Sequence, residues 1–365
     1  MKTRVKKIQI LTYTFLVIVG SSLCYSQSTN PRDNAQGSSG NAFRKVGAAG
    51  SEFLKIGVGA RANAMSGAFS AISNDMSSMF YNAAGLVDVN GYSADISYAQ
   101  WFGGYSHNYL AGVVPAGDKY RVGINIISFS SGEIPLTTLD RENALNITYS
   151  VSDFCLGGTF SAMLTDHFSF GVNLKYVQSS IASLNSSGVV ADIGTMYRFG
   201  GYRIGFAISN LGGQFQYAGQ DLNQQIDPTL PSQRLEAALL TTAYNLPLSF
   251  KAGMATDLTT ELLGMYESRE DLSAGVAREH RWLLAADFET LSDVPEQFAV
   301  GTEYVWNDFV AVRAGYRFGH DQFNLSGGFG LRYTGGGFDG SLDYSIQPTT
   351  NVGLVNRISL GLKLN

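Results

Sequence analysis

The sequence predicts an all-β protein: a transmembrane β-barrel of about 14 antiparallel strands with a short helical N-terminal hatch in the lumen. Three observations lead to this prediction. The chain starts with a secretory signal sequence, no later run of about 18 apolar residues could form a membrane-spanning helix, and apolar and polar residues alternate almost everywhere from Tyr92 onward. Because open strands would leave backbone groups unsatisfied in lipid, such a chain can enter a membrane only as a closed barrel.

The N-terminal residues have the composition of a signal peptide. Basic residues come first, an apolar core follows from Ile8 to Val19, and small residues lie near Ser26. This core is too short for a stable membrane anchor, so we expect the mature protein to leave the cytoplasm. A lipoprotein would use Cys24, but Leu23 stands where a small residue is needed just before that cysteine.

Four regions follow from these patterns. We assign a signal peptide to residues 1–26, a polar N-terminal segment to 27–58, a helical hatch to 59–90 and the transmembrane β-barrel to 91–365. The chain has 42 Gly, 19 Tyr and 22 Phe residues against 25 Lys and Arg, which suits strands with aromatic girdles and small lumen-facing residues. The net charge of -5 gives no electrostatic reason to expect a nucleic-acid partner.

The stretch from Gly59 to Leu86 is the part of the chain that the sequence predicts as helix. Its apolar residues Met65, Ala68, Phe69 and Ile72 recur at i, i+3, i+4 and i+7, which places them on one helical face. Many neighbouring residues are Ala, Gly and Ser, so the segment can approach other backbone closely, as a plug inside a barrel must. The hatch residues that we single out are Arg61, Met65, Phe69, Ile72, Asn82 and Gly85.

The alternation of apolar and polar residues defines the barrel strands. Near the C-terminus, leucine and isoleucine residues oppose Arg357, Ser359 and Lys363, so one face suits lipid and the other carries charge. We count about fourteen such segments, each about ten residues long, as a tilted membrane strand requires. They begin near Tyr92, His107, Asp118, Asp153, His167, Gly188, Tyr202, Leu246, Arg278, Glu296, Phe309, Gln322, Phe338 and Leu354.

Charged residues inside the strands are expected to line the lumen. A charge that faces lipid near the midplane costs about 2–4 kcal/mol, and all of these residues lie on the polar phase of their strands. They are Arg121, Lys175, Lys251, Asp287, Glu303, Arg313, Arg317, Arg332, Asp339, Asp343, Arg357 and Lys363. A soluble β-sandwich would also alternate, but it would not explain the signal peptide and the sided loops together.

The predicted strands are joined by tight turns and longer links in alternation. Tight turns are expected at Gly117-Asp118, Thr165-Asp166, Gly200-Gly201, Asn307-Asp308 and Gly335 to Gly337. Longer links are expected at Ser130 to Ser152, Leu211 to Asn245, Leu291 to Pro295 and Gln347 to Gly353. An up-and-down barrel places the two kinds on opposite sides of the membrane. The exception is Thr259 to Ala277, a long link on the side of the tight turns, in which Glu261 to Tyr266 is weakly helical.

No catalytic, metal or cofactor site stands out. Gly57 to Ala62 fits a GxGxxA pattern by letter, but a dinucleotide site needs a preceding strand in a βαβ unit. Cys155 is the only cysteine left after cleavage, so we expect no intramolecular disulfide. We predict no enzyme activity and no cofactor, although a dyad of loop residues such as Asp140, Glu142 or His280 is a weaker alternative. The histidines have no metal-binding spacing, and we expect each at an interface or in a loop: His107, His167, His280 and His320.

The hatch stretch closely resembles the N-terminal hatch signature of the PorV/PorQ family, a branch of the FadL-type outer-membrane barrels. The shared features are a GARA opening from Gly59, a small-residue helix, a break at Asn74-Asp75 and an ending that the family has as Asn-Pro-Ala-Gly-Leu. Here the ending runs from Asn82 to Leu86 with Ala83 in place of the proline, so we expect a less sharp turn. The resemblance covers the barrel by pattern only.

The resemblance implies a role in the type IX secretion system of Bacteroidota. In that family the barrel is thought to partner a large translocon subunit and to receive secreted cargo through the cargo's C-terminal domain. We therefore expect an outer-membrane protein of a Gram-negative bacterium, in contact with outer-membrane lipid, that binds and shuttles cargo. The alternative is a FadL-like channel for hydrophobic small molecules, and a lipid-modifying outer-membrane enzyme is a third class.

Two long links contain the residues that we expect to contact a partner. The links from Ser130 to Ser152 and from Leu211 to Asn245 are far longer than a hairpin needs, and loops of such length usually bind something or are disordered. Apolar side chains among polar neighbours are typical of a protein-binding surface, and a lipid cradle would have the same pattern. The expected contact residues are Ile134, Leu136, Leu139, Leu235, Leu239 and Leu240.

Overall fold

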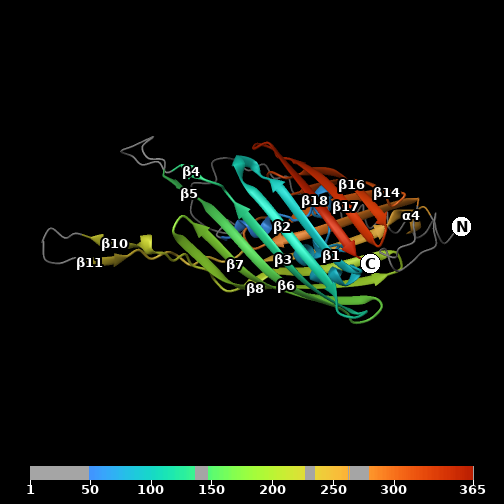
Figure 1. Cartoon of the computed structure of the whole chain (residues 1–365), viewed down its shortest axis with the longest axis horizontal. Helices are drawn as coiled ribbons and strands as arrows, with labels where there is room; N and C mark the ends of the chain where they lie inside the picture. Colours follow the sequence, from blue (N-terminus) through green and yellow to red (C-terminus); the bar gives the residue numbers. More distant parts are fainter. Residues whose placement is uncertain (1–48, 136–146, 227–234, 262, 264–278, 365) are drawn as a thin grey trace, which may run out of the picture. The chain divides into compact units, whose positions relative to one another are not determined.

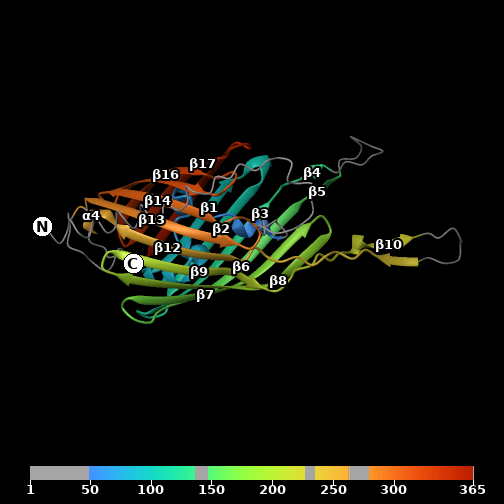
Figure 2. The same cartoon turned by 180° about the vertical axis from the view of Figure 1, so that it is seen from behind.

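The computed structural model describes residues 49–135, 147–226, 235–261, 263 and 279–364. They form a closed antiparallel barrel in which each strand pairs with its neighbours along the chain and β1 pairs with β18 (Figure 1, Figure 2). The fourteen barrel strands are β1 Tyr92–Gln100, β2 Ser106–Pro115, β3 Tyr120–Ser130, β6 Val151–Met163, β7 Phe168–Ile181, β8 Leu184–Phe199, β9 Tyr202–Gly212, β12 Ser249–Asp257, β13 His280–Leu291, β14 Gln297–Trp306, β15 Val310–Phe318, β16 Leu325–Gly335, β17 Phe338–Pro348 and β18 Leu354–Leu364. The predicted fold class is therefore confirmed, while the predicted signal peptide lies outside the described residues.

The strand boundaries follow the alternation closely. The largest difference is in β8, which was predicted from Gly188 and begins at Leu184. Its first residues are mainly polar on both faces, so the alternation gives no signal there. None of the described helices has the length and hydropathy needed to cross a membrane.

The links between strands fall at two ends of the barrel because the strands run up and down. We call one of them the turn end: it has the five tight turns that the sequence predicts, the start of β1 and the end of β18, whereas the tight β7–β8 turn lies at the opposite end. The other, the loop end, has the long β3–β6 and β9–β12 links, as predicted. The shorter elements there are η4 Phe102–Gly104, the hairpin of β4 Ile134–Pro135 with β5 Thr148–Tyr149, η5 Gln220–Leu222, and the hairpin of β10 Asn223–Ile226 with β11 Leu235–Ala238.

The long link between β12 and β13 is at the turn end, where the prediction placed its one exception. It opens with α4 Leu258–Glu261, so the helix lies earlier than the predicted Glu261 to Tyr266. A short polar motif explains the earlier start, because the Asp257 carboxylate accepts a hydrogen bond from the Thr259 backbone N–H at 3.0 Å. The remainder of the predicted helix lies almost entirely outside the described residues.

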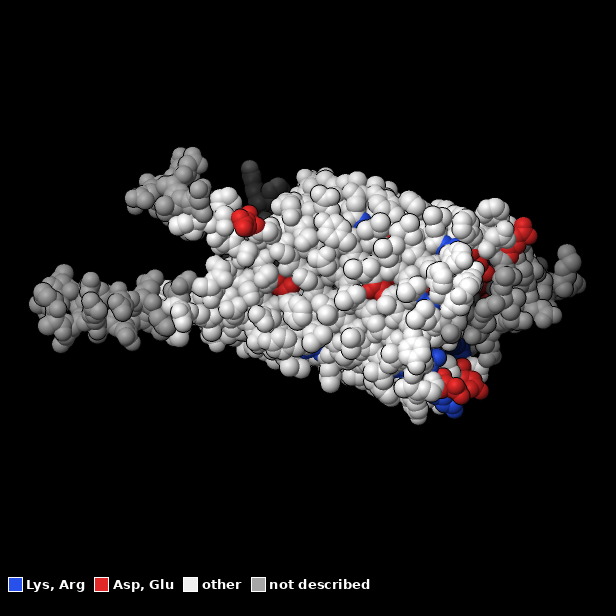
Figure 3. All heavy atoms as spheres, viewed as in Figure 1, with Lys and Arg blue, Asp and Glu red and all other residues white. Residues whose placement is uncertain are grey.

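The two faces of the strands differ in polarity as the alternation predicts. In β18, Leu360 and Leu362 are exposed on the outside, whereas Arg357 and Ser359 are buried on the inside. Figure 3 shows few charged side chains over the strands on the face in view. The outer surface is therefore apolar, and the charged residues of the strands point toward the hatch.

The hatch fills the lumen but is not one helix. It consists of α2 Ala60–Ala64, α3 Ser78–Tyr81 and η3 Ala83–Asp88, joined by irregular backbone, and η2 Glu52–Lys55 precedes it. The predicted helical face through Met65 and Ile72 is therefore wrong. The helix ends early because Ser66 and Gly67 have positive φ values of 54° and 77°, a conformation that stops a right-handed helix. Residues from Ala49 onward also contact the β9–β12 link, since the backbone N–H of Gly50 donates to the carbonyl of Asn245 at 3.0 Å.

Glycines on the inner face of the wall let the hatch backbone approach closely. A Cβ atom at Gly171, Gly194, Gly205, Gly301 or Gly315 would lie within 2.6 Å of a hatch atom, closer than side chains tolerate. Gly171 faces Gly194 across β7 and β8, and Gly301 faces Gly315 across β14 and β15. These paired glycines leave room on the inner face of the wall, so the hatch backbone packs directly against the wall backbone.

We expect Gly315→Val to loosen the hatch. A Cβ at this position would lie 2.3 Å from the carbonyl carbon of Met65, and overpacking of this kind costs about 1–3 kcal/mol. The measurement is the unfolding temperature of the purified barrel, together with protease cleavage within residues 60–88. Gly158→Val in β6 is the matched control, because a Cβ there meets nothing within 4 Å. Equal stability and equal cleavage of the two variants would contradict close packing of the hatch backbone against Gly315.

Candidate functional site

A buried arginine ties the hatch to the wall. Arg61 in α2 donates from Nε and Nη2 to the two carboxylate oxygens of Glu303 in β14, at 2.7 and 2.9 Å. Its Nη1 donates to Asn74 at 2.7 Å and to the Asp75 carboxylate at 3.0 Å. One side chain therefore joins the start of the hatch both to its middle and to the barrel, and this is the structural role of the predicted hatch residue Arg61.

The Arg61 site belongs to a larger network of buried charges. Glu303 also accepts a hydrogen bond from Arg313 Nε at 2.6 Å, and Arg313 Nη1 donates to Asp343 at 2.6 Å. Arg332 Nη2 lies 3.7 Å from the same Glu303 carboxylate. Removing one member of such a network leaves a charge buried without its partner, which costs several kcal/mol. The network is consequently a strong lock between hatch and wall.

Side chains of the wall also satisfy the irregular backbone of the hatch. The Asp287 carboxylate accepts from the backbone N–H groups of Phe69 and Ser70 at 3.1 and 2.8 Å. Arg317 donates from Nε and Nη2 to the carbonyl of Ser66 at 3.0 and 2.7 Å. Further wall donors to hatch carbonyls are Tyr109, Ser161, Ser169, Asn173, Ser326 and, at the end of the hatch, Arg121. The polar phase of the strands thus replaces the hydrogen bonds that a helix would make internally.

Asn82 and Gly85 shape the last turn of the hatch. The Asn82 side chain donates from Nδ2 to the carbonyl of Ser70 at 2.8 Å and to that of Thr195 in the wall at 3.1 Å. Its Oδ1 accepts from the backbone N–H of Ala84 at 3.1 Å and so caps η3. A Cβ at Gly85 would lie 1.9 Å from the carbonyl oxygen of Ser73, so only glycine fits.

The predicted apolar hatch residues form the centre of the lumen. Met65, Phe69 and Ile72 are all buried, and each packs in one hydrophobic cluster with residues of the wall. The Phe69 ring makes an edge contact with Tyr81 at 5.5 Å, and the Arg61 guanidinium lies 5.2 Å from the Phe69 ring centre. The structure therefore brings these side chains together although they do not share a helical face.

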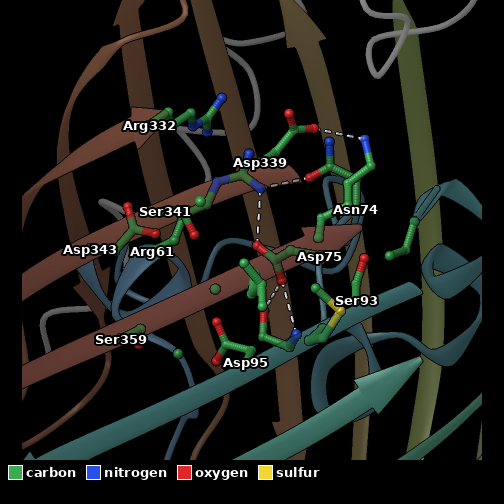
Figure 4. A pocket seen from close by; sticks show the side chains of 18 of the residues that line it. Arg61, Asn74, Asp75, Ser93, Asp95, Arg332, Asp339, Ser341, Asp343 and Ser359 are labelled. Carbon is green, nitrogen blue, oxygen red and sulfur yellow. Dashed lines mark hydrogen bonds and ion pairs between the residues drawn. The ribbon is translucent and has the colours of Figure 1, made fainter. Parts of the chain in front are cut away.

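A polar pocket lies at the turn end, between the hatch and β1, β16, β17 and β18 (Figure 4). Its volume is about 300 Å³. Charges of both signs line it: Arg61, Asp75, Asp95, Arg332, Asp339 and Asp343. Such a lining suits water and small ions, and an apolar ligand would have to desolvate these charges to enter.

The loop end carries a group of aromatic side chains that the sequence analysis did not single out. Trp101 contacts Phe102 at 5.2 Å and Phe323 at 5.3 Å between ring centres, and Tyr105 stacks on Phe129 at 5.4 Å. A backbone hydrogen bond from Trp101 to Tyr105 joins the two groups at 2.9 Å. We call these five residues the aromatic cluster. Its members come from separate links and strand ends, so only the folded chain assembles them.

His320 holds one side of the aromatic cluster. Its Nδ1 accepts hydrogen bonds from the backbone N–H groups of Gln322 and Phe323, both at 3.1 Å. Burial, with a contribution from Arg317, lowers the pKa of His320 to about 4. The imidazole is therefore neutral near pH 7 and can act as this acceptor, which keeps Phe323 beside Trp101.

The predicted partner-binding residues are only partly described. Ile134 is half-buried in β4, while Leu239 and Leu240 are 52% and 92% exposed in the β9–β12 link. Leu235 lies in β11, and its side chain is outside the described residues, as are Leu136 and Leu139. The structure places the β3–β6 and β9–β12 links at the same end of the barrel, and Ile134, Leu239 and Leu240 do not belong to the buried hydrophobic cluster of the described residues.

The structure corrects the expectation for one of the histidines. His107 is not an interfacial or loop residue, because it occupies the inner face of β2 and is fully buried beside Arg357. Within the described ranges, no group of three or more His, Cys, Asp and Glu side chains could hold a metal ion. Cys155 is a buried free thiol.

The fold is similar to solved structures of hydrocarbon transporters. The Ralstonia pickettii toluene transporter TbuX is 12% identical, with a TM-score of 0.50 over 85% of this chain and 99% of that chain. The Pseudomonas putida toluene transporter TodX is 13% identical, with a TM-score of 0.53 over 84% and 97%. The monoaromatic hydrocarbon channel CymD is 14% identical, with a TM-score of 0.51 over 85% and 98%.

These comparisons show the fold. The part of the sequence resemblance that concerns FadL-type barrels is confirmed at that level, and membership of the PorV/PorQ branch stays a prediction. No protein family and no curated protein matches the sequence.

We expect Arg61→Met to open the lumen. The substitution keeps an unbranched apolar stem but leaves Asp75 and Glu303 without their shared guanidinium, and breaking a buried pair costs about 3–5 kcal/mol. The measurement is single-channel conductance in planar bilayers, where the variant should conduct more often than the wild type. Lys363→Met is the matched control: its pair with Asp339 is partly exposed and is worth about 0–1 kcal/mol. A wild type that already conducts as a wide pore would disprove the sealed lumen.

Proposed function

We propose that the protein is an outer-membrane channel for small hydrophobic molecules. The observation that carries this proposal is the aromatic cluster at the loop end of a barrel that has the fold of the toluene transporters TbuX and TodX. Aromatic rings offer a large apolar area with a preferred stacking geometry, which suits flat apolar ligands. In this proposal the loop end faces the cell exterior, as long loops do in outer-membrane barrels.

The hatch and the charged pocket inside the lumen favour passage in steps over a permanently open pore. A ligand that enters past Trp101 and Phe129 meets the buried core of the hatch, and beyond it the charged pocket at the turn end. Passage therefore requires either movement of the hatch or a sideways exit through the wall. The protein is in this view a gated channel, located in the outer membrane of a Gram-negative bacterium, and its assignment to Bacteroidota rests on the hatch resemblance alone.

We expect Phe323→Ser combined with Phe129→Ser to reduce uptake of a small aromatic hydrocarbon. An aromatic contact contributes about 0.5–1.5 kcal/mol, so each substitution should weaken uptake about two- to tenfold. The assay is accumulation of radiolabelled toluene by cells that lack their own hydrophobic channels and produce this protein. Phe329→Ser in β16 is the matched control, because that ring is exposed on the outer face. Uptake no higher than in cells without the protein would refute the channel.

Binding and shuttling of secreted cargo, in contact with a translocon subunit, is the second candidate function. It is favoured by the adjacent Leu239 and Leu240 side chains, which are too exposed to serve the fold of the described chain. We expect Leu239→Ser with Leu240→Ser to leave the barrel assembled and to abolish co-purification of cargo C-terminal domains. The same variant should take up toluene normally. Cargo binding that survives the double substitution would remove this role for the link.

A further inference from the structure

A buried cation that has no acidic partner among the described residues lies in the wall just below the aromatic cluster. Arg357 in β18 is 2% exposed, and its Nη1 contacts His107 Nδ1 at 3.1 Å. The two side chains lie in one row across the sheet, since Arg357 pairs with Ala99 and Ala99 pairs with His107. Ala99 lies between these two residues, and its small side chain leaves room for the Arg357 guanidinium to reach the His107 imidazole. The row lies near the loop end, because Arg357 is close to the start of β18.

Arg357 differs from the other buried arginines of the lumen. Arg61, Arg198 and Arg313 each pair with a carboxylate, and the guanidinium of Arg121 is satisfied by backbone carbonyl groups. Among the described residues, Arg357 has no carboxylate within ion-pair distance. Its Nε and Nη2, the His107 Nε2 and the hydroxyl of the neighbouring Ser345 are all buried without a hydrogen-bond partner.

The unpartnered atoms of Arg357 have a specific geometry. Nε and Nη2 carry the two parallel N–H bonds of one guanidinium edge, which is the edge that binds a carboxylate in a bidentate manner. The same protein shows this use of the edge: Nε and Nη2 of Arg61 hold the two oxygens of Glu303 at 2.7 and 2.9 Å. A buried charge that lacks protein partners on this edge is costly, and an anion bound there would remove the cost.

We propose that Arg357, positioned by His107, is a binding site for a monovalent anion in the lumen, directly below the aromatic cluster. The His107 ring lies 6.4 Å from Phe129, so a bound anion would be next to the apolar rings. Two sources have this chemistry: a small inorganic anion such as chloride, or the carboxylate of an amphipathic molecule whose apolar part contacts the cluster. The second source rests on the proposed channel function, and the first does not.

The test is anion-dependent stability of the full-length barrel in an uncharged detergent. Unfolding temperatures are measured in a low-salt buffer and after addition of sodium chloride, bromide, benzoate or decanoate, with toluene or decanol as uncharged counterparts. Affinity should fall roughly ten- to hundredfold in Arg357→Gln, as expected for loss of charge-assisted hydrogen bonds. Arg121→Gln, which alters another buried wall arginine, should retain the wild-type response. Arg357→Lys keeps the charge without the bidentate edge and should bind carboxylates more weakly than the wild type.

The outcomes separate the two sources and the two proposals. A response to halides, with bromide located beside Arg357 in crystals, assigns an inorganic anion. A response to benzoate or decanoate and not to halides or the uncharged counterparts assigns a carboxylate ligand. Identical anion responses of the wild type and Arg357→Gln would overturn the site. Loss of the anion site should leave toluene uptake unchanged, because toluene is uncharged. Failure of the anion site and failure of the channel are therefore distinguishable.

Discussion

The structure depends on one constraint: an irregular segment inside a barrel must find a partner for every buried backbone group. The hatch has only short helical turns, so a number of its N–H and C=O groups lack the partner that one continuous helix would supply. The wall supplies the partners through its polar phase, with Asp287 accepting from hatch N–H groups and Arg317 donating to a hatch carbonyl. The charged residues of the strands are therefore part of the hatch fold and not simply a solvated lining.

The same constraint explains where glycine is needed. Hydrogen bonds from wall to hatch require the two backbones to lie close together, and a side chain between them would hold them apart. Gly194 in β8 would place a Cβ 2.2 Å from the Asn82 oxygen that caps η3. The composition alone associates the high glycine content with small lumen-facing residues. The structure places several of these glycines where the wall backbone packs against the hatch.

The barrel could be predicted from the sequence and the internal structure of the hatch could not. Alternation is a local signal that each strand carries by itself, so the strand positions, the sidedness of the links and the inward direction of Arg357 and Glu303 follow from it. The conformation of the hatch is decided by the wall: Ser66 takes a left-handed conformation where Arg317 and Ser326 contact it. The helical spacing of Met65 and Phe69 identified buried residues correctly but predicted the wrong backbone conformation. The aromatic cluster was missed because its residues come from links with no common pattern.

The distribution of polarity inside the barrel argues for binding before passage. In the described part of the chain, the lumen offers aromatic rings and the guanidinium of Arg357, which lacks an acidic partner, toward the loop end, whereas its charges toward the turn end are largely paired with each other. If the proposed channel function holds, an apolar or amphipathic molecule is stabilised at the loop end and destabilised at the turn end. The hatch lies between these regions and is locked to the wall by Arg61 and Glu303. In the proposed channel, movement of a ligand along the axis has to break that lock in a low-dielectric interior, so we expect release of the hatch, rather than entry of the ligand, to limit transport.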